Sequence, residues 1–127
     1  DPPIEKIKWV EDGFNKNEFF FIESLDSILL GMVRLSEEDL LYWGKLNDRS
    51  QYIHSLVILE AFSGQNIGSD VIKTIVKQAK KNNFNFLRLD CDSSNKKLCQ
   101  YYIKQGFTKV GQKKLPLGLY NLYQMNI

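Results

Sequence analysis

The sequence predicts a mixed α/β fold in which helices cover the faces of one β-sheet. In the middle of the chain, an apolar run at residues 52–59 is followed by a glycine-containing loop, a helical pattern and a second apolar run at residues 84–91. This order is typical of a βαβ unit, whose two strands pair in parallel through a right-handed crossover. Towards each end of the chain, two strand-like runs flank a short break, which is the pattern of antiparallel hairpins.

The N-terminal elements are expected to be a short helix, a hairpin and an irregular connection. Apolar residues recur at helical spacing over residues 4–14 and predict an amphipathic helix ending near Gly13; they are Ile4, Ile7, Val10 and Phe14. Residues 18–24 and 28–35 are rich in aromatic and branched side chains, so they should pair as a hairpin. Residues 36–50 begin with acidic residues and keep no regular period, which predicts a connection with at most one helical turn.

The central strand and helix carry the clearest patterns. The run at residues 52–59 is almost continuously apolar, as expected of a strand covered on both faces. From Ile67 onward, lysines lie on one side of a helix and an apolar stripe on the other, formed by Val71, Ile72, Ile75, Val76 and Ala79. Asn82 and Asn83 then mark the end of this helix before the strand at residues 84–91.

A second helix and a closing hairpin complete the chain. Residues 92–95 offer several N-cap side chains, and Gly106 is suited to the left-handed position that follows a helix. Residues 107–115 and 119–127 flank a Pro-Leu-Gly turn, which predicts the final antiparallel pair.

Length and composition limit the classes of function. A chain of 127 residues can bury one core, so residues 1–127 are predicted to form a single domain. The formal net charge of +2 is too small to indicate nucleic acid, and the helical lysines at 73, 77, 80 and 81 are expected to be solvated. No run approaches the roughly 18 apolar residues of a membrane span, and no signal peptide is visible, so no membrane partner is expected.

The two cysteines are consistent with a reducing compartment. Cys91 and Cys99 fall on a predicted strand and a predicted helix, and they resemble neither a secreted disulfide framework nor a metal-ligand pair. We therefore expect a cytoplasmic protein without a metal site.

The loop at residues 63–68 can bind an anion. Because it ends a strand and opens a helix, its backbone N–H groups are aligned with the positive end of the helix dipole, an arrangement suited to phosphate. Gly64 and Gly68 allow close approach of a ligand, and Asn66 tolerates positive φ well. Ordinary turn and capping chemistry explains the same residues, and neither the dinucleotide fingerprint nor the Walker loop is present.

Asn95 and Tyr102 share one face of the second helix. They are seven residues apart, which at 3.6 residues per turn places them nearly on one line, with Leu98 and Cys99 between them. This face therefore carries an amide and a phenol. Taken singly, each has a plain structural explanation, Asn95 as a cap and Tyr102 as a core tyrosine.

Taken together, residues 52–111 resemble the GNAT superfamily of acyl-CoA-dependent N-acyltransferases. The downstream motif matches the family's spacing at Leu89-Asp90-Cys91-Asp92, Asn95, Leu98, Tyr102 and Gly106-Phe107. The family's pyrophosphate loop, Gln/Arg-x-x-Gly-x-Gly/Ala, corresponds to Ser63-Gly64-Gln65-Asn66-Ile67-Gly68. Here Ser63 replaces the usual Gln or Arg, and Asn66 replaces the usual glycine.

The resemblance implies acetyl-CoA as cosubstrate and assigns its contacts. The pantetheine arm would pair with the strand backbone as an added strand, and the Ile58 amide would hold the thioester oxygen. The pyrophosphate would meet the loop amides, and Asn95 would touch the cofactor from the side. The implied cofactor-binding residues are Leu56, Val57, Ile58, Gly64, Gln65, Asn66, Ile67, Gly68, Ser69, Asn95 and Tyr102.

The resemblance also implies an acid and leaves the base open. Tyr102 corresponds to the general acid that protonates the departing CoA thiolate. Many relatives carry a glutamate where this chain has Tyr52. His54, on the same strand face, is one candidate base or relay and otherwise a structural histidine. Asp90 and Glu60 are the other candidates, of which Asp90 corresponds to an acid used in some relatives.

The expectation is therefore a GNAT-type N-acetyltransferase that moves an acetyl group to a primary amine, on a small molecule or a peptide, by direct attack in a ternary complex. The alternatives are a degenerate member that binds CoA as a sensor without turnover, and a phosphate- or nucleic-acid-binding domain. Homodimers are common among such domains, so a homodimer is one assembly that the resemblance allows, although the sequence does not fix the oligomeric state. The family's first strand and helix have no counterpart before residue 4, so either the sequence is truncated or the sheet is shortened at one edge.

Overall fold

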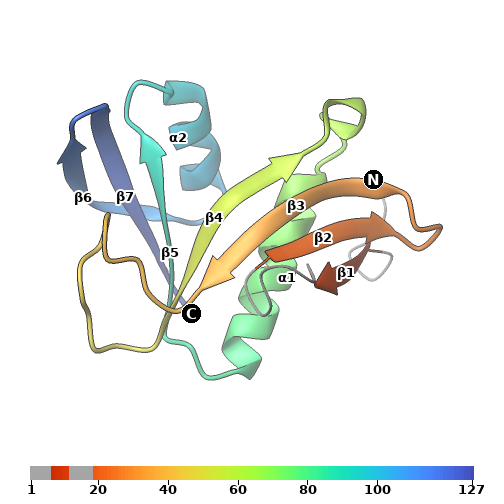
Figure 1. Ribbon diagram of the computed structural model, residues 1–127, viewed down its shortest axis with the longest axis horizontal. Coiled ribbons are helices and arrows are strands. Elements are labelled where there is room, and N and C mark those ends of the chain that lie inside the picture. The colour runs from red at the N-terminus through yellow and green to blue at the C-terminus, as the bar shows by residue number, and fades with distance from the viewer. Residues whose placement is uncertain (1–6, 12–18) are drawn as a thin grey trace. The chain divides into compact units, whose positions relative to one another are not determined.

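The computed structural model describes residues 7–11 and 19–127, and side-chain details are given for residues 19–127 (Figure 1). The strands within this part are β1 Ile7–Glu11, β2 Phe19–Ser24, β3 Leu29–Ser36, β4 Ser50–Ile58, β5 Phe86–Asp92, β6 Thr108–Leu115 and β7 Gly118–Asn126. The helices are the 3₁₀ turn η2 Glu60–Phe62, α1 Ile67–Lys81 and α2 Lys96–Lys104. By backbone pairing the strands follow the order β1-β2-β3-β4-β5-β7-β6, a mixed sheet of the predicted class.

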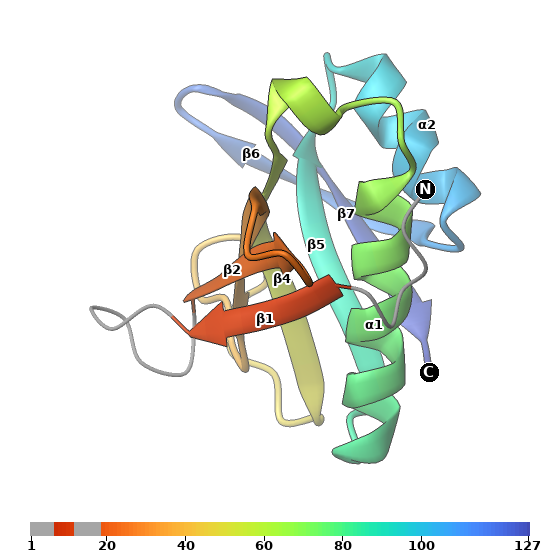
Figure 2. The ribbon, with the colours of Figure 1, turned by 90° about the vertical axis from the view of Figure 1, so that its right-hand side faces the viewer.

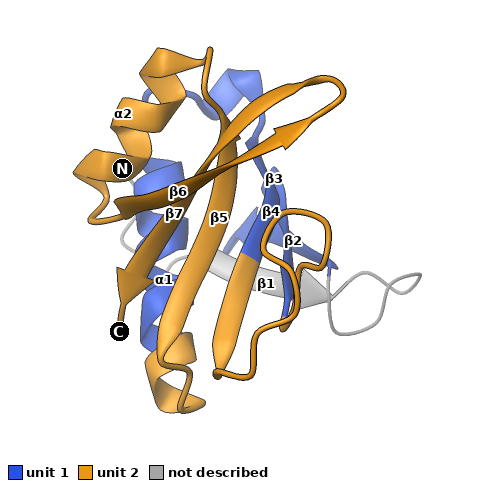
Figure 3. Ribbon diagram, turned by 90° about the vertical axis from the view of Figure 1, so that its left-hand side faces the viewer, with its two compact units in different colours: residues 1–36, 53–78 blue, residues 37–52, 79–127 orange. Residues whose placement is uncertain are grey.

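The chain forms two compact units (Figure 3). The first unit comprises residues 1–36 and 53–78, and the second comprises residues 37–52 and 79–127. The strand β4 begins in the second unit and continues in the first, and the helix α1 begins in the first unit and ends in the second.

In the first unit, β2 pairs antiparallel with β1 (Figure 2), and on its other edge it pairs antiparallel with β3. The β2–β3 hairpin confirms the prediction for residues 18–24 and 28–35. The predicted helix over residues 4–14 is wrong within the described residues, because Ile7–Glu11 is a strand whose partners run from Ile7↔Ser24 to Glu11↔Phe20. The rest of that predicted helix lies outside the described residues. β2 supplies the backbone partners that a local helical pattern cannot reveal.

The burial pattern of α1 confirms the predicted apolar stripe. Four of its first-unit residues are at most 2% exposed, namely Ile67, Val71, Ile72 and Ile75. Its four lysines are exposed, as expected of a solvated face. The helix ends before Asn83, whose φ of 65° is the left-handed conformation that asparagine tolerates. Within the described residues, no helix is both long and apolar enough to cross a membrane.

In the second unit, β5 is the central strand. The start of β4 pairs with it in parallel, from Ser50↔Phe86 to Tyr52↔Arg88, which confirms the βαβ prediction. On its other edge β5 pairs antiparallel with β7, and β7 pairs with β6 in the predicted closing hairpin. The helix α2 lies beside these strands (Figure 3), where Cys99 on the helix and Cys91 on β5 bring their sulfur atoms to 3.4 Å.

A buried arginine organises the other face of β5. Arg88 is 5% exposed, and its guanidinium binds both carboxylate oxygens of Asp48 at 2.7 and 2.8 Å. The same group donates to Ser50 Oγ and to Tyr52 Oη, and it lies 4.8 to 5.8 Å from the ring centroids of Phe86, Trp43 and Tyr52. The connection before β4 is therefore fixed to β5 by one bidentate ion pair, the strong form of a charge-assisted hydrogen bond. No pattern in the sequence predicted this cluster.

Candidate active site

The loop that opens α1 has the backbone geometry of an anion site. Gly64 and Asn66 both adopt positive φ, at 79° and 57°, so Asn66 takes the conformation that a glycine would take at this position. The first helical hydrogen bond runs from Asp70 N–H to the Asn66 carbonyl, so the preceding amides of Ile67 and Gly68 head the helix. A side chain at Gly64 would meet open space. The exposed loop can thus present backbone N–H groups to an incoming phosphate.

The second half of β4 is irregular and closely fitted to β3. Ser55 has a φ of 51°, which is uncommon for a non-glycine residue and interrupts the regular strand. Further along, the Leu59 N–H donates to the Leu30 carbonyl at 2.8 Å. A Cβ on Gly31 would overlap the Val57 carbonyl oxygen and lie 3.1 Å from Ile58 Cα. The backbone of residues 56–58 is therefore positioned by a glycine that permits close strand contact.

His54 lies just before this irregularity, in the first unit. Its Nε2 is 3.0 Å from the hydroxyl oxygen of Ser36 at the end of β3. This bond fixes the imidazole ring relative to β3, which suits either a structural histidine or a member of a proton relay.

The helix α2 begins as the sequence predicts. The Asn95 side chain accepts a hydrogen bond from the Leu98 N–H at 3.2 Å, so Asn95 is the N-cap. Gly106 follows the helix with a φ of 107°. A hollow of about 360 Å³ is lined by Asn95, Lys97, Leu98 and Tyr101. The predicted amide therefore caps its helix and also borders a space large enough for part of a ligand.

Tyr102 lies on the buried face of α2. It is 8% exposed, and its ring contacts those of Tyr101, Phe107 and Tyr123. Its hydroxyl makes no hydrogen bond to any residue in the described part of the chain. Burial raises the pKa of Tyr102 above its ordinary value of 10.0, with smaller contributions from neighbouring groups, of which Cys91 is the largest. The phenol therefore keeps its proton at neutral pH and can act as a donor.

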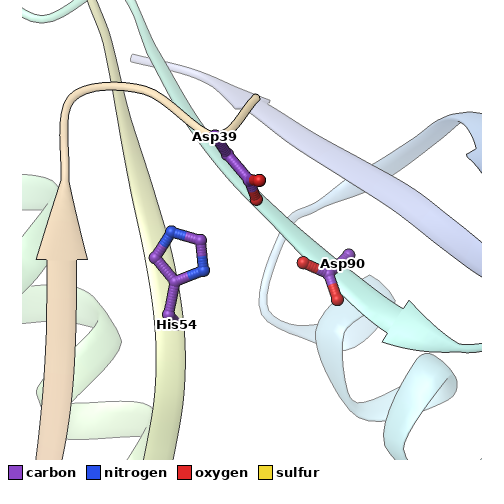
Figure 4. A group of neighbouring side chains, drawn as sticks. All are labelled: Asp39, His54 and Asp90. Atoms are coloured by element: carbon purple, nitrogen blue, oxygen red, sulfur yellow. The ribbon is translucent and has the colours of Figure 1, made fainter. Parts of the chain in front are cut away.

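Asp90, the third of the predicted catalytic residues, lies close to another acid. A carboxylate oxygen of Asp39, in the connection between β3 and β4, lies within 4.8 Å of one of Asp90. Figure 4 shows the Asp39 carboxyl group extending towards Asp90 on β5; the third residue drawn, His54, belongs to the first unit. Burial, and next the charge of Asp39, raise the pKa of Asp90 to about 6. A carboxylate with this pKa can accept and release protons near neutral pH.

Asp90 and Tyr102 lie on opposite faces of the β5–β7 pair. Successive side chains on a strand point to opposite faces, and Cys91 points to the face that α2 covers. Asp90 therefore points away from α2, to the face where Arg88 donates to Gln124 on β7. Asp90 and Tyr102 therefore lie near the same part of β5 and β7, but the two strands stand between them.

The fold and the motif spacing agree with a known family. The family model of the GNAT acetyltransferases matches residues 1–107. The chain belongs to this family. No curated protein shows significant similarity to it.

Solved GNAT structures share this fold. An acetyltransferase of the GNAT family from Listeria monocytogenes is 30% identical with a TM-score of 0.75, and the match covers 87% of this chain and 64% of that one. A GNAT acetyltransferase from Elizabethkingia anophelis with acetyl-CoA bound has 17% identity and a TM-score of 0.72, over 86% and 75% of the two chains. A chimeric spermidine N-acetyltransferase from Vibrio cholerae and hSSAT has 17% identity and a TM-score of 0.68, over 85% and 65%. The chain thus spans less than two thirds of the Listeria protein.

Some features of the candidate site are not visible in the sequence. Asp39 falls in the segment predicted as irregular, whose acidic start was the only signal. The positive φ of Ser55 has no residue signature, because serine is not a residue expected there. Asn66 did carry a signal, and the structure confirms its positive φ.

Proposed function

We propose that the protein is an acetyl-CoA-dependent N-acetyltransferase that acts on a primary amine by direct attack. The observation that carries this proposal is the position of Tyr102, a buried phenol on α2 at the family's spacing from the Asn95 cap. The phenol is protonated at neutral pH, as a general acid must be before it gives its proton to the departing thiolate.

Each unit carries residues that the family resemblance assigns to the cofactor. In the first unit, the amides of residues 64–69 would hold the pyrophosphate at the head of α1, where Asn66 already has glycine-like geometry. The backbone of residues 56–58 would pair with the pantetheine arm along the edge of β4 that β3 does not occupy. In the second unit, the hollow beside Asn95 would receive a further part of the cofactor, and Lys97 brings a positive charge to its lining.

The reaction would proceed without a covalent enzyme intermediate. The substrate ammonium loses one proton to a base, and the free amine nitrogen attacks the thioester carbonyl carbon. The bond from carbon to sulfur breaks, and the thiolate takes the Tyr102 hydroxyl proton. The tyrosinate regains a proton from the acylated nitrogen, directly or through water. The products are the amide, CoA and one proton that the base releases to solvent.

Cys91 is poorly suited to a covalent route. Burial, and next its hydrogen-bonding neighbour Cys99, raise the pKa of Cys91 to about 12. Because the thiolate is the nucleophilic form, a thiol with this pKa reacts slowly at neutral pH. This favours direct attack by the amine.

The comparisons support the choice of cosubstrate and acceptor class. A structural neighbour holds acetyl-CoA, and others are spermidine N-acetyltransferases, whose named substrate is an amine. These neighbours are less than 20% identical to this chain. The acceptor is therefore proposed as a primary amine without a named compound.

An amine panel tests the proposal. The full chain is incubated with acetyl-CoA and a set of mono-, di- and polyamines, amino-group-bearing antibiotics and peptides, and the free CoA thiol is followed with time. We expect acceptor-dependent thiol release and an acetylated product of the corresponding mass. Thermal stabilisation by CoA without thiol release across the panel would instead show a CoA-binding sensor. Ser63, in place of the usual Gln or Arg, is the feature that favours this second function.

A further inference from the structure

Asp39 is held rigidly in the second unit. It is 8% exposed, and its Oδ1 accepts a hydrogen bond from the Tyr42 N–H at 3.2 Å. Its carbonyl accepts from the Trp43 N–H at 2.9 Å, and its backbone forms an isolated bridge with Gly44. The turn at residues 39–44 therefore fixes both the backbone and the carboxyl group of Asp39.

Asp39 places a second carboxyl group within 4.8 Å of the Asp90 carboxyl group, where it acts as a like charge. Arg88 lies two residues before Asp90 on the same face of β5, but its guanidinium is committed to Asp48. From β7 and the 39–44 turn, the facing titratable groups are Tyr120 and Tyr42, whose rings meet edge to face at 5.2 Å. The pKa of Tyr42 is raised, first by burial and then by Asp90, Tyr120 and Asp39. The remaining titratable side chain drawn in Figure 4 is His54 on β4.

We propose that Asp39 is a positioning residue that keeps the Asp90 carboxylate ready to accept the proton of the substrate ammonium. This rests on the proposed function and deepens it by naming the base and the residue that tunes it. Two carboxylates at this separation cannot both ionise easily, so the negative charge of Asp39 increases the proton affinity of Asp90. Asp90 then accepts one proton from the ammonium, and the nitrogen lone pair becomes free to attack.

The first experiment measures the proton directly and does not depend on turnover. The side-chain carboxyl groups of Asp39 and Asp90 are titrated by ¹³C NMR in the wild type and in the Asp39→Asn variant. Asparagine keeps an oxygen for the Tyr42 N–H and removes only the charge. We expect the Asp90 midpoint to lie near pH 6 and to move to lower pH in Asp39→Asn. An Asp90 midpoint near pH 4, or one that Asp39→Asn leaves in place, would overturn the proposal.

A matched control removes a charge from the same connection. Glu37 is exposed, with its carboxylate 3.7 Å from Arg49, so Glu37→Gln should leave the Asp90 midpoint unchanged. If Asp39→Asn lowers the thermal midpoint, Asp39→Ser provides a second variant, because its hydroxyl can also accept from the Tyr42 N–H. The shift of the Asp90 midpoint must appear in at least one Asp39 variant whose thermal midpoint matches that of the wild type.

The second experiment follows kcat/KM against pH with the best amine of the panel. In the wild type we expect kcat/KM to fall on the acidic side with a midpoint near pH 6. In Asp39→Asn this midpoint should move to lower pH. At pH 6 the variant's kcat/KM, relative to its own plateau, should then be up to about twofold higher than that of the wild type. Asp90→Asn should lose the limb and at least about 100-fold in kcat/KM. A limb that disappears in His54→Gln and persists in Asp90→Asn would assign the base to His54 and contradict the proposal. A shifted Asp90 titration without turnover would refute the proposed function and leave the electrostatic pairing intact.

Discussion

Asp90 and Tyr102 lie on opposite sides of the β5–β7 pair: Asp90 points away from α2, and Tyr102 packs from α2 onto the other face, against Tyr123. They therefore cannot pass a proton directly to one another. In the proposed reaction they would serve different atoms, Asp90 the attacking nitrogen and Tyr102 the leaving sulfur. Substitutions at the two positions should accordingly give different kinetic and thermodynamic effects.

Tyr102→Phe should lower kcat by on the order of 100-fold or more, while CoA affinity changes little. The ring contacts remain, and no hydrogen bond to a described residue is removed, so the thermal midpoint should also stay close to that of the wild type. Steady-state kinetics and calorimetric CoA titration measure the two quantities. Tyr123→Phe removes a hydroxyl from the neighbouring buried ring and should keep its turnover. Unchanged kcat in Tyr102→Phe would remove this residue from the mechanism.

Asp90→Asn should stabilise the protein at pH 8 and give little or no stabilisation at pH 4. The folded-state pKa of Asp90 is raised to about 6, so its contribution to stability is fully present below the unfolded value, near 4, and is lost as pH rises through 6. Thermal unfolding at the two pH values measures the difference. Asp92→Asn is a control of opposite sign, because hydrogen bonds from Ser94 lower the pKa of Asp92. Equal effects of Asp90→Asn at both pH values would contradict a raised pKa.

Asn95→Ala should cost about 1 kcal/mol of unfolding free energy through loss of the α2 cap. Asn95→Ser keeps a side-chain oxygen for the Leu98 N–H and should cost clearly less. Urea unfolding of the two variants gives the comparison. An alanine variant as stable as the serine variant would mean that the cap hydrogen bond contributes nothing.

The Asp48–Arg88 pair should respond unequally to loss of its two members. Asp48→Asn leaves a buried guanidinium without its anion and should cost about 3 to 5 kcal/mol. Arg88→Met leaves a carboxylate that is 30% exposed and can turn to water, so its electrostatic cost should be smaller. Denaturant unfolding of the single variants and of the double variant measures this asymmetry. The predicted asymmetry is refuted if Arg88→Met is less stable than Asp48→Asn.

The sequence predicted those elements whose signals are local. The βαβ unit, both hairpins, the Asn95 cap and the Gly106 terminus follow from periodicity and from residues with a strong conformational preference. The strand β1 was misassigned because four apolar residues at helical spacing outweighed a pairing with β2, whose partners run from Glu11↔Phe20 to Ile7↔Ser24, 9 to 17 residues apart in the sequence. The proximity of Asp39 to Asp90 could not be predicted, because it depends on how the irregular connection folds onto a distant strand.

The two buried thiols bear on how the activity is measured. Cys91 and Cys99 are 4% and 6% exposed, and the pKa of Cys91 is raised to about 12. Reagents that count thiols react with exposed thiolates, so the native protein should give a flat baseline against which every molecule of released CoA is visible. A signal from the enzyme alone would then report unfolding in the cuvette. The same reagent thus provides both the assay and a check that the protein in it is intact.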